Sequence, residues 1–401
     1  MIRKIGAVAA LALVLLGTAG ARPNATPGVT STSILLGGTA PLTGEAAAAA
    51  GVARGADAYF KYVNSRGGIY GRKIAYKYLD DAYDPSKTVQ AVRELVQQDE
   101  VFALFSTVGT NSNLAVRDYL NASKVPQLFV AAGATTFGRD YAKYPYTIGY
   151  LPTYSAEGQI YARRILATNA KKAKVAVLYQ DDDYGRDLLS GFQKGLGSHR
   201  DMLVAKVGYD PASSDVQSQV AELKASGANT FCVFAFGKFA IQTFVYVSKL
   251  GWKPQIYVND VASASSVMQL MPQATAEGSI SIVFAKDPAT PKFAKDPGVK
   301  LAGTIIKRFV PGGNPGDGFL VAGMVSAFTM VDTLKKAGKS LTRDGVVKAA
   351  VNLNEANNPF VLPGIVVKTT PKSRYPISQV SLQRWHKGHW ELFGGLIGAK
   401  P

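Results

Sequence analysis

The chain has 401 residues, of which 47% are hydrophobic and 18% are charged, and its formal net charge is +17. This length suits two lobes of ordinary size better than one very large domain, and the composition excludes a largely disordered protein. The basic residues are dispersed along the sequence and are not clustered with stacking aromatics, which argues against nucleic-acid binding.

The N-terminus has the features of an export signal. Arg3 and Lys4 precede an apolar run over residues 5–16, and small residues follow at positions 19–21. This order is typical of a signal peptide, so we expect residues 1–21 to be removed on export. The apolar run is too short to span a membrane, and we expect no transmembrane segment after it.

The single cysteine, Cys232, lies in an apolar run far from the predicted cleavage point. Its position excludes a lipid-bearing cysteine at that point, and a lone cysteine excludes an internal disulfide. We interpret Cys232 as a small buried hydrophobic residue. These features predict a soluble, monomeric protein that is periplasmic or secreted.

The first part of the chain alternates between strand and helix patterns. Short apolar or alternating runs predict strands, and apolar residues at helical spacing predict the helices between them. Asp84 and Pro85 form a helix-start signal, because an aspartate caps a helix and a proline suits its first turn. The predicted strands are 34–38, 73–79, 101–105 and 127–130, and the predicted helices are 52–63, 87–98 and 113–121.

The middle of the chain repeats this alternation. Strands that alternate with helices predict parallel sheets covered by helices on both faces. Ligands of such sheets bind beyond the carboxyl ends of the strands, so the loops there are the candidate site. The predicted helices are 156–168, 185–195, 215–226 and 239–250, and the predicted strands are 174–179, 203–207, 230–234 and 255–258.

The pattern changes after Phe284. Two Pro-containing turns, 286–291 and 295–298, predict a crossing between lobes. Helices are predicted over 299–309 and 319–337. The tail has two strand-like runs that begin at Gln379 and His389, which are typical of a hairpin that returns to the second lobe.

Signatures of catalysis are missing from the sequence. It has no G-x-x-x-x-G-K-[ST] loop, no H-E-x-x-H pair and no G-x-S-x-G elbow, and its three histidines offer little acid-base chemistry. We expect no catalytic residue, no metal and no cofactor. Asp181, Asp182 and Asp183 lack the spacing of a calcium loop and favour a polar loop that leads into a helix. His386 and His389 are expected in a solvated turn.

Two loops suit a ligand carboxylate. Hydroxyls and unpaired backbone N–H groups gather where a strand leads into a helix, and such groups hold anions well. Capping of the following helix is the alternative role for the hydroxyls. The candidate residues are Thr110 and Asn111 in the loop 107–112, and Gly133, Ala134 and Thr135 in the loop 131–136.

These features together resemble the type I periplasmic binding proteins of ABC transporters, in the branch that binds leucine, isoleucine and valine. The resemblance covers roughly residues 33–395. The matching runs are Ala40-Pro-Leu-Thr-Gly44, Arg54-Gly-Ala, Asn64-Ser-Arg-Gly-Gly-Ile-Tyr-Gly-Arg72, Asp80-Asp81 with Asp84-Pro85, and Asp183-Tyr184-Gly185.

The resemblance implies an α/β fold with two doubly wound, Rossmann-like lobes that are joined by a three-crossover hinge and close over a ligand. The first lobe would comprise residues 33–150 and 286–372. The second lobe would comprise residues 151–285 and 373–401.

The resemblance also implies roles for individual residues. Thr110 and Thr135 match hydroxyls that hold the ligand carboxylate, with the backbone of Gly133 and Ala134 beside them. Tyr184 matches an aromatic ring that contacts the ligand. Asp260 matches an acidic position that receives the ammonium of an amino acid, and the alternative is that it caps a helix after a strand. Phe236 matches an aromatic position that often carries a hydroxyl.

Departures from the family pattern leave two classes of ligand possible. Phe236 lacks the hydroxyl, and residues 48–50 are alanines where amino-acid binders commonly have a bulky or polar side chain. The alanines predict a wider pocket, which favours an aromatic or other hydrophobic carboxylate. Asp260 favours an α-amino acid.

The resemblance and the residues together predict an extracytoplasmic substrate-binding protein of an ABC importer. We expect it to bind a branched-chain or related hydrophobic amino acid between its lobes and to deliver it to a permease with its ATPase. An aromatic or other hydrophobic carboxylate is the alternative ligand. A sensory ligand-binding module is the alternative function, although such modules usually continue into a transmembrane helix and a signalling domain.

Overall fold

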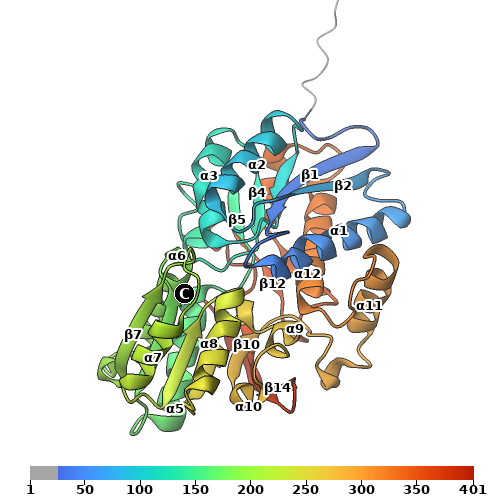
Figure 1. The fold of residues 1–401 in the computed structure, drawn as a ribbon. Helices are drawn as coiled ribbons and strands as arrows, with labels where there is room; N and C mark the ends of the chain where they lie inside the picture. Colours follow the sequence, from blue (N-terminus) through green and yellow to red (C-terminus); the bar gives the residue numbers. More distant parts are fainter. Residues whose placement is uncertain (1–25) are drawn as a thin grey trace, which may run out of the picture.

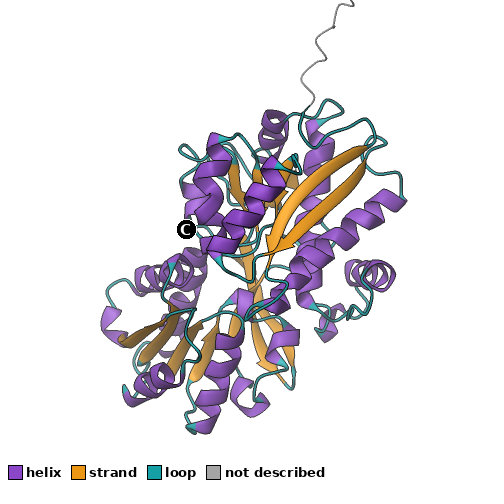
Figure 2. Ribbon diagram, turned by 45° about the horizontal axis from the view of Figure 1, so that its top comes forward, coloured by secondary structure: helices purple, strands orange, loops and turns teal. Residues whose placement is uncertain are grey.

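The structure is a computed structural model that describes residues 26–401, and the predicted signal peptide, residues 1–21, lies outside the described residues. Strands and helices alternate in it and gather in two bodies, which we call lobe 1 and lobe 2, each built around its own sheet (Figure 1). Helices flank both sheets in the second view (Figure 2). The alternation predicted from the sequence is therefore confirmed.

Lobe 1 holds a five-stranded parallel sheet in the order β2-β1-β3-β4-β5. Asp84 caps the second helix as predicted, since its carboxylate accepts a hydrogen bond from the N–H of Ser86 at 2.8 Å and Pro85 opens the first turn. The strands are β1 (Ser33–Ala40), β2 (Lys73–Asp80), β3 (Ala103–Phe105), β4 (Gln127–Val130) and β5 (Thr147–Gly149). The helices between them are η1 (Ala47–Ala49), α1 (Ala50–Ser65), α2 (Pro85–Gln97), α3 (Thr110–Ala122) and α4 (Thr136–Arg139).

Lobe 2 holds a seven-stranded sheet in the order β14-β13-β10-β9-β8-β6-β7. Its strands are β6 (Val175–Gln180), β7 (Leu203–Tyr209), β8 (Thr230–Phe234), β9 (Gln255–Val258), β10 (Ile280–Val283), β13 (Gln379–His386) and β14 (His389–Gly398). The first five are parallel. The predicted C-terminal hairpin does return to this sheet, and it makes the edge antiparallel by pairing β13 with β10.

The helices of lobe 2 follow its strands. The longer ones are α5 (Tyr154–Asn169), α6 (Asp183–Leu196), α7 (Gln217–Ala225) and α8 (Lys238–Lys249). The short ones are η2 (Arg200–Met202), η3 (Asp260–Ala262), α9 (Ser265–Met268) and α10 (Gln273–Ala276). Cys232 is fully buried in β8, as the sequence predicted.

A later segment of the chain returns to lobe 1. It contains η4 (Pro291–Phe293), α11 (Pro297–Phe309), α12 (Gly318–Ala337), α13 (Arg343–Ala350) and the small pair of β11 (Asn354–Glu355) and β12 (Val367–Lys368). Helix α12 lies across α1, where glycines allow the two backbones to meet. A Cβ on Gly55 would lie 1.9 Å from the carbonyl oxygen of Leu320, and a Cβ on Gly323 would lie 2.0 Å from that of Val52.

Helix α12 is the one described helix that is long and apolar enough to cross a membrane by length and composition alone. Of its most apolar stretch, 67% is buried inside the protein. A buried core helix passes the same test, and its packing on α1 identifies α12 as such a helix.

Connecting segments run between the lobes after β5, after β10 and before β13. The segment after β10 pairs with one from lobe 1, because Lys286 donates its backbone N–H to Phe360 and Leu362 donates its own to Phe284, both at 2.8 Å. The connecting segments are therefore tied to lobe 1 by backbone hydrogen bonds.

Candidate functional site

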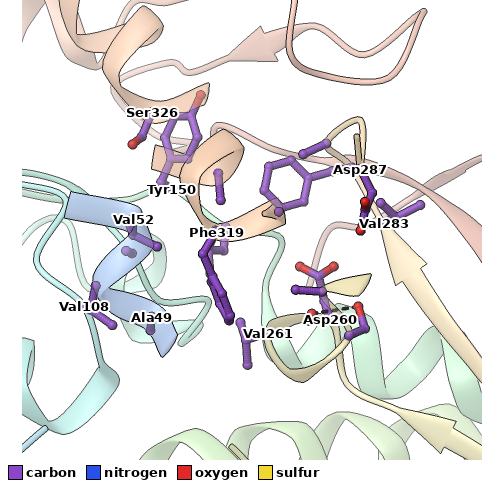
Figure 3. A pocket seen from close by; sticks show the side chains of 18 of the residues that line it. Ala49, Val52, Val108, Tyr150, Asp260, Val261, Val283, Asp287, Phe319 and Ser326 are labelled. Atoms are coloured by element: carbon purple, nitrogen blue, oxygen red, sulfur yellow. Dashed lines mark hydrogen bonds between the residues drawn. The ribbon is translucent and has the colours of Figure 1, made fainter. Parts of the chain in front are cut away.

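A cavity with a volume of about 130 Å³ lies between the lobes, next to the connecting segments. Ala49 and Val52 line it from the start of α1, and Val108 lines it from the loop after β3. Val261 of η3 faces them from lobe 2. The ring of Phe319, in the first turn of α12, projects between these two walls (Figure 3).

Most of the cavity lining is apolar. Besides the residues above, the rings of Phe129, Tyr150, Phe236 and Phe284 contribute to it. Ala49 belongs to the run of alanines that predicted a wide pocket, and its small side chain lines the cavity. Burial of a hydrophobic ligand against such a lining is favourable at about 25 cal/mol per Å² of apolar surface.

Asp260, at the start of η3, places its carboxylate at the cavity. No donor among residues 26–401 hydrogen-bonds this carboxylate, and it caps no helix. The backbone N–H of Asp260 instead donates to Oε1 of Glu157 at 2.6 Å, and the Tyr161 hydroxyl donates to the same oxygen at 2.7 Å.

Burial raises the pKa of both the Asp260 and the Glu157 carboxyl, and the nearby charge of Asp260 raises the pKa of Glu157 further. The ionised forms are therefore disfavoured while no cation is close. A positive group in the cavity would stabilise an ionised Asp260, which is the behaviour expected of a receptor for an ammonium group.

The predicted donors Thr110 and Gly133 lie against a tyrosine of lobe 2. Thr110 is the first residue of α3 and is 2% exposed. Its side chain does not cap this helix, and its Oγ1 has no hydrogen-bond partner among the described residues. Burial raises the pKa of the Tyr154 phenol, while the Gly133 N–H and the Thr110 hydroxyl act against this rise. Both donors therefore sit near the phenol and outside the cavity lining.

The other predicted donors are bound to carboxylates of lobe 2. Thr135 donates both its backbone N–H and its hydroxyl to Oδ2 of Asp187, at 2.8 and 2.9 Å. Asn111 donates its side-chain amide to Asp182 at 3.1 Å. Thr135 occupies the N-cap position of α4, but its hydroxyl makes no capping hydrogen bond to that helix. The loops predicted to hold a ligand carboxylate hold protein carboxylates here, and these bonds join the two lobes.

Tyr184, Ala134 and Phe236 occupy three different positions. Tyr184 is 2% exposed and packs its ring against Tyr154 with centroids 5.0 Å apart, outside the cavity lining. Ala134 borders a much smaller hollow near Gly133. Phe236 lines the cavity and packs against Tyr83 of lobe 1, with ring centroids 5.3 Å apart. Of the eight predicted site residues, Asp260 and Phe236 line the main cavity.

Sequence reasoning missed four residues of this region: Glu157, Phe319, Asp287 and Gln383. Asp287 lies just after β10, a strand that the sequence did not predict. The rule that ligands bind after strand ends would have singled out Asp287 had that strand been recognised. Glu157 and Gln383 lie inside a helix and a strand, where no local pattern indicates a site.

The aspartates considered for calcium have a structural role. Asp182 caps α6 by accepting hydrogen bonds from the N–H groups of Tyr184 and Gly185 at 3.0 and 3.2 Å. Within residues 26–401, no three His, Cys, Asp or Glu side chains gather closely enough to hold a metal ion.

Comparison with known proteins connects this geometry to a family. A family model described as periplasmic binding protein matches residues 33–389. The Leu/Ile/Val-binding protein homolog 7 of Brucella abortus is 25% identical over 334 residues, which cover 81% of this chain and 82% of that protein.

Solved structures show the same fold. A branched chain amino acid ABC transporter protein from Thermus thermophilus with bound valine has a TM-score of 0.81 at 17% identity, and the match covers 92% of this chain and 97% of that one. A solute binding protein from Rhodopseudomonas palustris BisB5 in complex with 3,4-dihydroxy benzoic acid has a TM-score of 0.76 at 18% identity, with coverage of 92% and 98%.

Proposed function

Since this chain belongs to the periplasmic binding protein family, we propose that it is the extracytoplasmic substrate-binding protein of an ABC importer. Its ligand is a branched-chain or related hydrophobic amino acid, which it binds in the cavity between the lobes and delivers to a permease with its ATPase. A signal peptide over residues 1–21 directs its export to the periplasm or the exterior.

The observation that supports this ligand most strongly is Asp260. Its carboxylate borders an apolar cavity and has no hydrogen-bond donor within the described residues. A half-buried carboxylate without a partner is poorly solvated, and the ammonium of an amino acid would provide both charge and donors. The apolar walls would then hold the hydrophobic side chain.

The size of the cavity also suits a small ligand. Its volume of about 130 Å³ is close to that of an engineered apolar cavity of about 150 Å³ that holds benzene. A branched aliphatic side chain of four carbons fits such a space, with the main-chain end of the amino acid directed to Asp260.

The ligand would hold the lobes together because it contacts both. Val52 and Phe319 belong to elements of lobe 1, and Asp260 belongs to lobe 2. A ligand shifts a population toward the closed form only when it binds that form better. A ligand that contacts both walls of the cavity binds the closed form better than the open form. The closed form is the one that a permease would recognise.

An aromatic carboxylate is the second candidate, and the aromatic lining supports it. Phe129, Phe236, Phe284 and Phe319 all border the cavity, and a ring would pack well against them. The acidic Asp260 disfavours this ligand, because two like charges in a poorly solvated site repel each other.

A thermal-shift panel on the protein without residues 1–21 tests the proposal. We expect L-leucine, L-isoleucine or L-valine to raise the unfolding temperature, since a ligand at a hundred times its Kd adds about 2.7 kcal/mol to the free energy of unfolding. Asp260→Asn should abolish this rise. Stabilisation by benzoate-type acids, equal in the wild type and in Asp260→Asn, would instead favour the second candidate.

A further inference from the structure

One end of lobe 1 carries a basic surface that folding assembles from two segments far apart in the sequence. The first is the turn between α1 and β2, residues 66–73, and the second is the end of α12 with the residues after it, 335–339. Together they hold six basic side chains and no acidic one. We call this surface the Tyr70 patch, and its members are Tyr70, Arg66, Arg72, Lys73, Lys335, Lys336 and Lys339.

Side-chain hydrogen bonds join the two segments. The Tyr70 hydroxyl donates to the carbonyl oxygen of Lys335 at 2.8 Å, and Nη1 of Arg72 donates to that of Lys339 at 2.9 Å. These bonds hold the turn against the end of α12. The basic residues of both segments therefore form one surface.

The positive charge of the Tyr70 patch is not compensated by carboxylates. None of its six basic side chains forms an ion pair within residues 26–401. Arg72 is half-buried, and the other five are exposed. The ammonium groups of Lys73 and Lys336 donate to backbone carbonyl oxygens, which carry no net charge. The patch therefore presents a positive field to the solvent.

Tyr70 stands out at the centre of this surface. It is the most exposed aromatic residue in the part of the chain that the structure describes, at 48%. Its φ of 51° lies in the left-handed region, which a bulky side chain rarely adopts and which costs free energy. Burial within lobe 1 does not account for a tyrosine here. A ring with a polar tip is well suited to the boundary between water and lipid.

The Tyr70 patch lies far from the ligand cavity. Helix α1 lines the cavity with Val52 and α12 lines it with Phe319, both near the starts of these helices, whereas the patch lies at their ends. Helices of 16 and 20 residues are about 24 and 30 Å long. A partner on the patch therefore leaves the cavity accessible.

We propose that the Tyr70 patch is a docking surface for a membrane that contains anionic phospholipid. Clusters of about four to eight basic residues attract anionic headgroups, and the patch has six such residues. The ring of Tyr70 enters the headgroup layer. A nucleic acid suits the patch less well, because a single exposed aromatic offers no platform for successive bases. Such docking goes beyond the proposed function and keeps the receptor close to the membrane of its permease.

Co-sedimentation of the full mature chain with lipid vesicles tests this proposal. Vesicles of phosphatidylcholine with phosphatidylglycerol are negatively charged, and vesicles of phosphatidylcholine alone are not. At about 0.1 M salt, where the screening length is about 10 Å, we expect the protein to bind the mixed vesicles only. At about 1 M salt, where this length falls to about 3 Å, we expect it to be released.

Two double variants of equal charge locate the surface. Lys335→Gln with Lys336→Gln removes two charges of the patch, and Lys171→Gln with Lys172→Gln removes an exposed pair between α5 and β6 of lobe 2. Each basic residue at a membrane surface changes binding about fivefold. The first variant should therefore bind the mixed vesicles about twenty-fivefold more weakly. The second should stay within about twofold of wild type, because its charges lie beyond the screening length.

Tyr70→Asn tests the ring. Asparagine adopts the left-handed conformation more readily than tyrosine does, so this variant should unfold at a temperature no lower than the wild type. It should nevertheless bind the mixed vesicles several-fold more weakly. Weaker vesicle binding with unchanged stability is a result that a purely structural role of Tyr70 does not predict.

Each outcome decides the inference. Equal weakening by the two lysine pairs overturns the patch, because it would show that net charge alone attracts the vesicles. Vesicle binding by Tyr70→Asn as tight as that of wild type overturns the role of the ring. If wild-type protein does not bind the mixed vesicles at low salt, the proposal is wrong, and binding of a DNA duplex in that case would assign the patch to nucleic acid instead.

Discussion

At the scale of single residues, the carboxyls of Asp260 and Glu157 set the electrostatics of the site. Glu157 is buried and Asp260 is half-buried in lobe 2, neither forms an ion pair within residues 26–401, and desolvation raises the pKa of each. In the unfolded chain both groups ionise near the ordinary carboxyl pKa of about 4. The folded protein without ligand therefore binds more protons than the unfolded chain above that pH.

This difference predicts how stability depends on pH. Because the folded pKa values are raised, the stabilising contribution is present below the unfolded pKa and is lost as pH rises through the folded values. We expect the unfolding temperature of ligand-free protein to fall between about pH 5 and about pH 8, and the rise caused by leucine to grow over the same range. Calorimetric scans at several pH values measure both slopes.

Two variants isolate the source of that slope. Glu157→Gln removes one of the buried carboxyls and should flatten the pH dependence. Glu222→Gln changes an exposed glutamate of α7 and should leave it unchanged. Equal slopes in the wild type and in Glu157→Gln would show that the buried pair does not control stability.

At the scale of elements, the contact between α1 and α12 depends on glycines. The Cβ of an alanine at position 55 would clash with the backbone of Leu320. A Cβ on Gly303, inside α11, would clash with nothing, because its nearest neighbour would lie at an ordinary contact distance of 3.9 Å. The same substitution should therefore have opposite effects at the two positions.

Gly55→Ala should lower the free energy of unfolding by about 1–3 kcal/mol or more, because the two helices must separate to admit the methyl group. Gly303→Ala should raise it by roughly 0.5–1 kcal/mol, since alanine is the better helix former. Urea denaturation of both variants measures this. A Gly55→Ala protein as stable as the wild type would contradict the close approach of α1 and α12.

The elements also show how far sequence reasoning reaches. Long helices such as α12 and alternating strands such as β2 were predicted because their periodicity is clear. Strands β5 and β10 were missed, although β3 and β4, which are equally short and buried, were predicted. A run of three or four buried residues has too few positions for a period, so it can be recognised only from its flanking sequence. Helix α13 was missed as well, as it has only eight residues.

The candidate site divides in the same way. Asp260 and Phe236 were named because they match site positions of the family that the sequence resembles, and both follow predicted strands. Asn111 and Thr135 also follow strands, but their partners Asp182 and Asp187 come from the other lobe. A local sequence pattern can indicate which residues of a loop are hydrogen-bond donors. It cannot indicate which acceptor from the other lobe will bind them, because that depends on how the lobes pack. The roles of all these residues in ligand binding stay predictions.

At the scale of the whole molecule, polar contacts hold the lobes together, and they include three that involve charged side chains. Asp187 bonds Thr135, Asp182 bonds Asn111, and Lys238 pairs with Glu45 at 2.7 Å. The Asp187 bridge uses two donors of one residue, and Asp187 is half-buried, so its loss should matter more than that of a surface pair.

Asp187→Ala should therefore shift the ligand-free protein toward an open form, which small-angle X-ray scattering would detect as a larger radius of gyration. Saturating leucine should restore the compact value. Asp181→Ala is the control, because Asp181 pairs with Arg186 inside lobe 2 at 2.9 Å and does not bridge the lobes. The same radius for Asp187→Ala and the control would show that this bridge does not govern closure.

The central claim is that a hydrophobic amino acid binds between the lobes with its ammonium at Asp260. A crystal structure of the mature protein grown with L-leucine tests it most directly. We predict leucine in the cavity, with its nitrogen in hydrogen-bond contact with Asp260 and its side chain against Val52 and Phe319. Leucine bound elsewhere, or leucine in the cavity with its carboxylate toward Asp260, would contradict the claim.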